Sequence, residues 1–254
     1  MKLLKCLVAA CAILLIVASA LCAAENAKPK NVRVYIVRHG RTEWNKEGRL
    51  QGQIDVKLDE TGIAQAEKTA QRFAGMKLAA VLVSPLSRAR VTGEAIAKAA
   101  GCETIVADPG FMEINLGEVQ GKTMKEVLAS DLAPIAKQWA AAPDTVRYPG
   151  EGGESLEMVE KRAVEALERL AAQYEGNVVL ATHGVAATVL LAHYLGSPLS
   201  NYWRFKLDNC GVSCVEFTAK GAARVTLMND TSHLKYVDEK IRIPAWNPVF
   251  LMRA

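Results

Sequence analysis

Two short apolar runs of this chain, at about 32–37 and 177–182, each end at a histidine that a glycine follows. The first is rich in β-branched and aromatic residues and the second is largely apolar, as buried strands are. Arg38-His39-Gly40 closes the first run and His183-Gly184 the second. Glycine allows a sharp turn after each strand, and ligands of open α/β sheets bind at the carboxyl ends of the strands. We therefore expect the two imidazoles to face one crevice if the strands are parallel.

Strand and helix patterns alternate after the first run. Four segments follow it in turn, a helix at 63–74, a strand at 79–83, a helix at 86–100 and a short strand at 104–107. Gly75 and Gly101 stand at the ends of the two helices, where glycine is favoured. This order is typical of parallel βαβ units.

The pattern loosens at 117–150, where we expect one or two short helices and interpret the segment as a small cap inserted over the sheet edge. Regular structure returns with a helix for which Ser155 is the expected N-cap, an apolar helix at 185–195, and strands at 212–217 and 223–228. Because the apolar helix has no polar face, it must be buried. The predicted fold is α/β, a three-layer αβα sandwich whose mostly parallel sheet carries helices on both faces.

The first residues of the chain have a composition of their own. Met1 to Lys5 carry two positive charges, no charged residue follows until Glu25, and the stretch ends in small residues. This is the pattern of a secretory signal peptide, with an uncleaved membrane anchor as the alternative. We expect a signal peptide at 1–24, a linker at 25–31, the domain at 32–234 and a C-terminal extension at 235–254. The protein is then exported, periplasmic or extracellular, and keeps no stable membrane span after cleavage.

Charge and cysteine content narrow the range of partners. The formal net charge is +4, and the absence of a dense Lys/Arg run argues against a nucleic-acid partner. No C-x-x-C or H-E-x-x-H spacing predicts a metal site. Cys102, Cys210 and Cys214 follow the signal segment. They are too few for a disulfide framework, and we expect Cys210 and Cys214 in the core.

Side chains that carry chemistry gather at the predicted strand ends. They are two imidazoles, two guanidiniums and one carboxylate: His39, His183, Arg38, Arg88 and Glu113. Helix N-termini near Leu86 and Gly184 add partial positive charge. Such a set suits the binding of a phosphate group.

Several blocks of the sequence carry a resemblance. They are Arg38 to Asn45, Gln51-Gly52, Leu58 to Gly62, Ser84 to Ala89, Glu113 to Gly121, Gly153 to Ser155, Thr182 to Gly184 and Asn229 to Leu234. In this order and spacing the chain resembles the histidine phosphatase superfamily, in its phosphoglycerate-mutase-like branch and there the broad-specificity phosphatases. The resemblance covers about residues 32–234.

The resemblance implies a role for each side chain of the site. His39 would be the nucleophile that forms a phosphohistidine, which requires a neutral ring. Arg38, Arg88 and His183 would hold the oxygens of the transferring group. Glu113 would protonate the leaving oxygen and then accept a proton from the attacking water.

The same resemblance implies the remaining substrate contacts, which are Asn45, Gln51, Gly52 and Gly184. The substrate would be a small phosphate ester, and no metal or other cofactor is needed because protein cations take its place. Arg41 could reach a second anionic group or be an exposed loop residue. His193 and His233 are expected to be structural, and Trp44 to pack beneath its loop.

These features predict a histidine acid-type phosphatase, that is, a phosphomonoester hydrolase that works through phosphohistidine. A phosphoglycerate mutase is the alternative among enzymes. The segment between Glu113 and His183 is too short for the longer insertion that mutases of this family place over the site. The Arg41-Thr42 pair also resembles the phosphatases, and export would separate the protein from glycolysis. A non-catalytic phosphate-binding module would lack one of the five site residues, and all five are present.

Overall fold

The computed structural model describes residues 31–234. The predicted signal peptide at 1–24, nearly all of the linker at 25–31 and the extension at 235–254 lie outside the described residues. Within the described part, none of the helices combines the length and the apolar character that crossing a bilayer requires.

One six-stranded sheet forms the centre of the molecule, in the order β3-β2-β4-β1-β5-β6. Its strands are β1 (Val32–Arg38), β2 (Leu78–Val83), β3 (Ile105–Ala107), β4 (Gly176–Thr182), β5 (Val212–Phe217) and β6 (Ala223–Asp230). Strands β1 to β4 run parallel to one another, whereas β5 is antiparallel to β1 and β6 is antiparallel to β5. The short connection between β5 and β6 allows only an antiparallel pair, because parallel strands need a long crossover.

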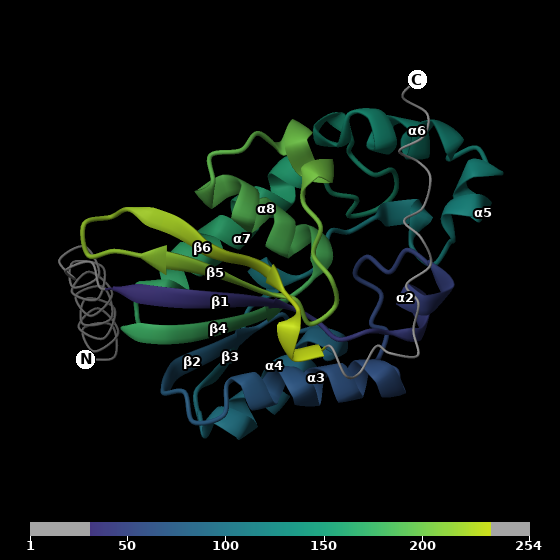
Figure 1. The fold of residues 1–254 in the computed structure, drawn as a ribbon. Helices are drawn as coiled ribbons and strands as arrows, with labels where there is room; N and C mark the ends of the chain where they lie inside the picture. The colour runs from purple at the N-terminus through teal and green to yellow at the C-terminus, as the bar shows by residue number, and fades with distance from the viewer. Residues whose placement is uncertain (1–30, 235–254) are drawn as a thin grey trace, which may run out of the picture.

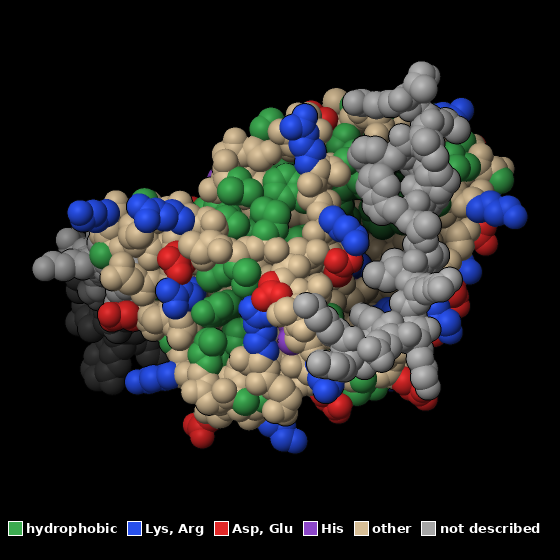
Figure 2. Space-filling view, viewed as in Figure 1, with side chains coloured by type: hydrophobic (Ala, Val, Ile, Leu, Met, Phe, Trp, Pro, Cys, Tyr) green, Lys and Arg blue, Asp and Glu red, His purple; other side chains and the backbone are tan. Residues whose placement is uncertain are grey.

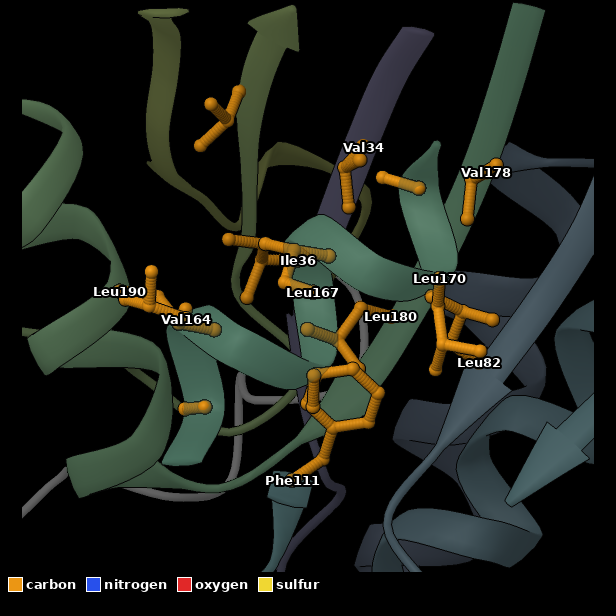
Figure 3. Packing of buried hydrophobic residues seen from close by; sticks show 14 of the residues in the cluster. Val34, Ile36, Leu82, Phe111, Val164, Leu167, Leu170, Val178, Leu180 and Leu190 are labelled. Carbon is orange, nitrogen blue, oxygen red and sulfur yellow. The ribbon is translucent and has the colours of Figure 1, made fainter. Parts of the chain in front are cut away.

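Helices cover both faces of the sheet, which confirms the α/β prediction (Figure 1). On one face lie α3 (Glu60–Arg72) and α4 (Ser87–Ala100), packed through a cluster that contains Phe73, Ile96 and Val179. On the other lie α7 (Leu156–Ala171) and α8 (Gly184–Tyr194). Their contact with the sheet is the large core cluster around Ile36, Leu167 and Leu180 (Figure 3).

Helix α8 is apolar all round because it is buried from two sides. Leu190 and Leu191 pack into the sheet core, whereas Ala186 and Val189 belong to a second cluster. Through that second cluster the segment at 117–150 packs against α8. The segment contains α5 (Met124–Leu128), α6 (Ala133–Ala141) and the short 3₁₀ turns Gly117–Val119 and Pro143–Thr145. These elements lie beyond the carboxyl ends of the parallel strands (Figure 1).

Local capping explains where the helices begin. Ser155 caps α7 as predicted. Helix α3 begins earlier than its apolar pattern suggested, because the Asp59 side chain accepts the Gly62 N–H. The sequence pattern missed the short helix α2 (Glu43–Glu47), which a reciprocal capping box between Thr42 and Asn45 starts.

Three further 3₁₀ turns, Pro109–Phe111, Leu199–Arg204 and Ser232–Leu234, complete the described elements. Strand β6 is an edge of the sheet, and its residues are at most partly buried. Hydrophobic side chains reach the surface beside it (Figure 2). Cys210 and Cys214 are buried, as predicted.

Candidate active site

His39 follows the last residue of β1 and is buried. Its Nδ1 lies 2.7 Å from the carbonyl oxygen of Gly40. Because a carbonyl oxygen can only accept, Nδ1 carries the proton and Nε2 keeps its lone pair. Burial, followed by the nearby charges of Arg88 and Arg38, holds the pKa of His39 well below its usual range. The ring is therefore neutral and has one nitrogen available for attack.

His183 is the residue before α8, and its ring centroid lies 5.2 Å from that of His39. Its Nε2 is 2.8 Å from the Ser84 hydroxyl, and its buried Nδ1 has no partner among the described residues. Burial lowers the pKa of His183 well below its usual range, and Arg88, among other charges, adds to this effect. His183 is therefore a neutral group, so the positive charge around it comes from the arginines.

Arg38 and Arg88 are each anchored by backbone carbonyl groups. Arg38 Nη1 donates to Leu207 at 2.6 Å, and Arg88 donates to Gly52 at 2.7 Å and to Ile54 at 2.9 Å. The Nε atoms of both arginines are buried without a partner among the described residues. Burial lowers the pKa of Arg88 to about 10, so it stays charged at neutral pH. Each guanidinium thus keeps a buried donor for a bound anion.

Glu113 lies against the N-terminus of α8. Its carboxylate accepts the backbone N–H of Val185 at 3.1 Å and of Ala186 at 3.3 Å. A helix N-terminus favours a negative charge at this place. A Cβ on Gly184 would lie 3.5 Å from Arg38 Nε and 3.7 Å from Glu113 Oε2. Gly184 therefore lies between Arg38 and Glu113, and a Cβ there would meet both at ordinary contact distances.

The predicted substrate loop joins the same region. The Asn45 amide oxygen accepts from the Thr42 backbone and from Asn209, and Asn209 also donates to the His39 carbonyl at 2.9 Å. Gln51 is buried, and its Oε1 has no partner among the described residues. Gly52 has a φ of 53°, and its carbonyl holds Arg88. The structure thus brings all the predicted site residues to one end of the sheet.

Sequence reasoning missed the groups that hold this site in place. Arg162 of α7 uses all five N–H donors, on both carboxylate oxygens of Glu154 and on the carbonyls of Gly110, Met112 and Glu113. Glu154 also accepts the N–H of Asn115 at 2.8 Å. The pair therefore fixes the main chain on both sides of Glu113. Glu154 stands in one of the resembling blocks, but nothing distinguishes Arg162 among the other charged residues of its helix.

Other residues have structural partners. Arg41 is half-buried and donates through Nε to Asp59 and through Nη2 to Thr61, at 2.8 Å each. His193 lies 3.1 Å from Glu160, and His233 contacts Thr69 and Arg72. Within the part of the chain that the structure describes, no three His, Cys, Asp or Glu side chains come together as a metal would require.

A neutral histidine with one free nitrogen, two anchored arginines and a carboxylate share the carboxyl edge of a doubly covered α/β sheet. These features define a protein of the histidine-based phosphoryl-transfer class. The chain belongs to the histidine phosphatase superfamily (branch 1), whose sequence profile matches residues 34–231. This confirms the resemblance seen in the sequence.

Some of the proteins that this chain is similar to are named as mutases and others as phosphatases. A probable phosphoglycerate mutase GpmB of Serratia proteamaculans is 36% identical over 190 residues, which cover 73% of this chain and 85% of that protein. The structure of Bacillus stearothermophilus YhfR matches with a TM-score of 0.74 and 31% identity, covering 80% of this chain and 100% of that one. A phosphoserine phosphatase from Entamoeba histolytica, in complex with 3-phosphoglyceric acid, gives 0.69 and 30%, with 80% and 99% covered.

Proposed function

We propose that this protein is a phosphomonoester hydrolase that works through a phosphohistidine on His39. The observation that carries the proposal is the bond between His39 Nδ1 and the Gly40 carbonyl. It fixes the ring of a buried, neutral imidazole and leaves the Nε2 lone pair beside Arg38, Arg88 and His183.

In the first step, Nε2 of His39 attacks phosphorus, and the bond from phosphorus to the ester oxygen breaks as the bond to nitrogen forms. The two arginines and His183 hold the oxygens of the transferring group, which is most of what this chemistry requires. Glu113, in its protonated form, gives its proton to the leaving oxygen. The alcohol then departs, and the phosphoryl group stays on His39.

In the second step, a water molecule attacks the phosphohistidine. The Glu113 carboxylate accepts a proton from this water as the bond between phosphorus and nitrogen breaks. Its position at the α8 N-terminus suits the charged form that this step needs. Inorganic phosphate leaves, and both His39 and Glu113 return to their starting states.

Two features favour hydrolysis over isomerisation. The segment between Glu113 and His183 is short, and a mutase needs a cover that shields its phosphohistidine from water. In addition, the Asp59 carboxylate pairs with Arg41 and offsets the positive charge that Arg41 would offer to the second anionic group of a bisphosphate. The names of the GpmB relatives favour the mutase reading instead.

The two activities can be separated in one assay. Residues 25–254 are incubated with 3-phosphoglycerate, with and without the bisphosphate primer, and 2-phosphoglycerate and free phosphate are measured. A parallel panel of aryl, sugar and amino-acid phosphates defines the preferred ester. We expect phosphate release that does not depend on the primer. Primer-dependent interconversion much faster than phosphate release would overturn the hydrolase assignment.

We also propose that the protein works outside the cytoplasm, on the basis of the signal-like residues 1–24. Cell fractionation with mass measurement of the N-terminus tests this. A mature chain that begins near residue 25 supports export, whereas a full-length cytoplasmic chain contradicts it.

A further inference from the structure

Ser84 and His183 form a fully buried pair at the centre of the site. Ser84 directly follows β2 and His183 directly follows β4, and the Ser84 N–H donates to Ala181 of β4 at 3.0 Å. The Ser84 hydroxyl oxygen lies 2.8 Å from His183 Nε2. None of the roles assigned above uses this hydroxyl.

Counting hydrogen atoms shows which group donates. The Ser84 oxygen already accepts the Leu86 N–H at 3.3 Å. Its single hydrogen needs an acceptor because the residue is buried, and among the described residues the His183 Nε2 is the acceptor that it reaches. If Nε2 carried a proton instead, the hydroxyl hydrogen would be buried without a partner.

This assignment places the proton of a neutral His183 on Nδ1. That nitrogen is buried and has no partner among the described residues. The adjoining residue, Gly184, lies beside Arg38 Nε, and the His39 ring is next to the His183 ring. The N–H of Nδ1 is therefore a buried donor at the place where the oxygens of a phosphoryl group would bind.

We propose that Ser84 is a positioning residue that holds His183 in its Nδ1–H tautomer, so that His183 donates a hydrogen bond to an oxygen of the transferring phosphoryl group. The role in transfer rests on the proposed function. The two histidines then share one tautomer but are anchored through opposite nitrogens. His39 is held by its N–H and presents a lone pair, whereas His183 is held by its lone pair and presents an N–H.

The tautomer can be measured without any activity. Long-range ¹H–¹⁵N spectra of protein labelled with ¹⁵N-histidine distinguish a protonated from an unprotonated ring nitrogen, and a His183→Gln variant assigns the signals. We expect His183 of the phosphate-free protein at neutral pH to have a protonated Nδ1 and an unprotonated Nε2. A protonated Nε2, alone or together with Nδ1, would overturn the proposal.

Enzyme kinetics and phosphate binding test whether the tautomer of His183 affects phosphoryl transfer. In Ser84→Ala, the spectra should lose the single tautomer, and kcat/KM for an aryl phosphate should fall about tenfold, the size of one net hydrogen bond. The affinity for inorganic phosphate should weaken to a similar extent. Ser130→Ala is the matched control, because Ser130 also accepts the N–H two residues on, at 3.2 Å, but lies in the cap. It should leave all three properties unchanged.

An unchanged tautomer and unchanged kinetics in Ser84→Ala would contradict the proposal. If that variant fails to fold, the spectra of the unmodified protein still decide the tautomer. If the protein hydrolyses no ester while His183 has the expected tautomer and binds phosphate through it, the proposed function fails and the assignment of Ser84 stands.

Discussion

At the scale of single residues, the reactive character of His39 comes from one backbone carbonyl and from burial. The Gly40 oxygen orients the ring, and exclusion of water keeps it neutral beside two arginines. The same ring exposed on a loop would expose both nitrogens to water and would be partly protonated near pH 6.5.

Replacing His39 by Ala should abolish both turnover and phosphoryl labelling, because it removes the Nε2 that attacks phosphorus in the proposed mechanism, whereas Nε2 of the neighbouring His183 is engaged by Ser84. Rapid quenching with a ³²P-labelled ester measures the phosphoenzyme. His193→Ala serves as the control, since His193 lies in the last turn of α8, at the other end of that helix from His183, and its ring contacts Glu160 of α7. Near-normal hydrolysis by His39→Ala would contradict the nucleophile assignment.

Replacing Glu113 by Gln should slow esters with poor leaving groups far more than activated aryl esters. A general acid matters most when the departing oxygen is basic, and its loss costs on the order of 10²–10⁴ in rate. Comparing kcat for an alkyl and a nitrophenyl phosphate measures this difference. Equal slowing of both esters would move the acid role elsewhere, first to Glu43 or Glu118.

At the scale of elements, two helices position the loop that carries Glu113. Helix α8 receives the carboxylate at its N-terminus, and α7 holds the flanking backbone through Arg162. The loop has little regular structure of its own, since 3₁₀ turns are its only described helical elements. Its geometry therefore depends on the packing of both helices against the sheet.

Replacing Arg162 by Lys should keep the charge but lose the planar fork that joins Glu154 to three carbonyl groups. In Arg162→Lys we expect the ratio of kcat for a nitrophenyl phosphate to kcat for an alkyl phosphate to rise toward the ratio in Glu113→Gln. A misplaced acid can cost on the order of 10²-fold in rate. Arg169→Lys is the control on the same helix, where an exposed arginine pairs with Asp108. Leaving-group selectivity unchanged by Arg162→Lys would limit this residue to a role in stability.

At the scale of the whole molecule, burying neutral histidines couples stability to pH. Burial lowers the pKa of His39, His183 and His233. In the unfolded chain these rings bind protons below about pH 6.5, whereas in the folded protein they bind them only at a lower pH. Their effect on stability is therefore absent above that pH and becomes unfavourable as the pH falls below it.

We expect the urea midpoint of unfolding to be lower at pH 5.5 than at pH 7.5. His183→Gln should show a shallower dependence, because one of the coupled rings is gone. Asp230 does not interfere, because hydrogen bonding to Ser232 lowers its pKa to about 2, and the stability that it contributes is lost only below about pH 4. Equal midpoints at the two pH values would show that the histidines are not kept neutral by folding.

The sequence by itself determined the alternation of strands and helices, the burial of α8 and the residues that meet at the strand ends. These follow from hydrophobic periodicity, from capping residues and from where a strand stops, all of which are local. The family could also be recognised, because its motif blocks keep their order along the chain.

Only the tertiary structure decided how these residues are held. Ser84 and His183 are 99 positions apart, and Arg162 is 49 from Glu113. The pairing of Arg41 with Asp59 and the antiparallel direction of β5 against β1 are likewise absent from any local pattern. Hydrogen-bond partners, tautomers and pKa values depend on which distant groups packing brings into contact and on how completely it excludes water. Periodicity along the chain carries neither kind of information.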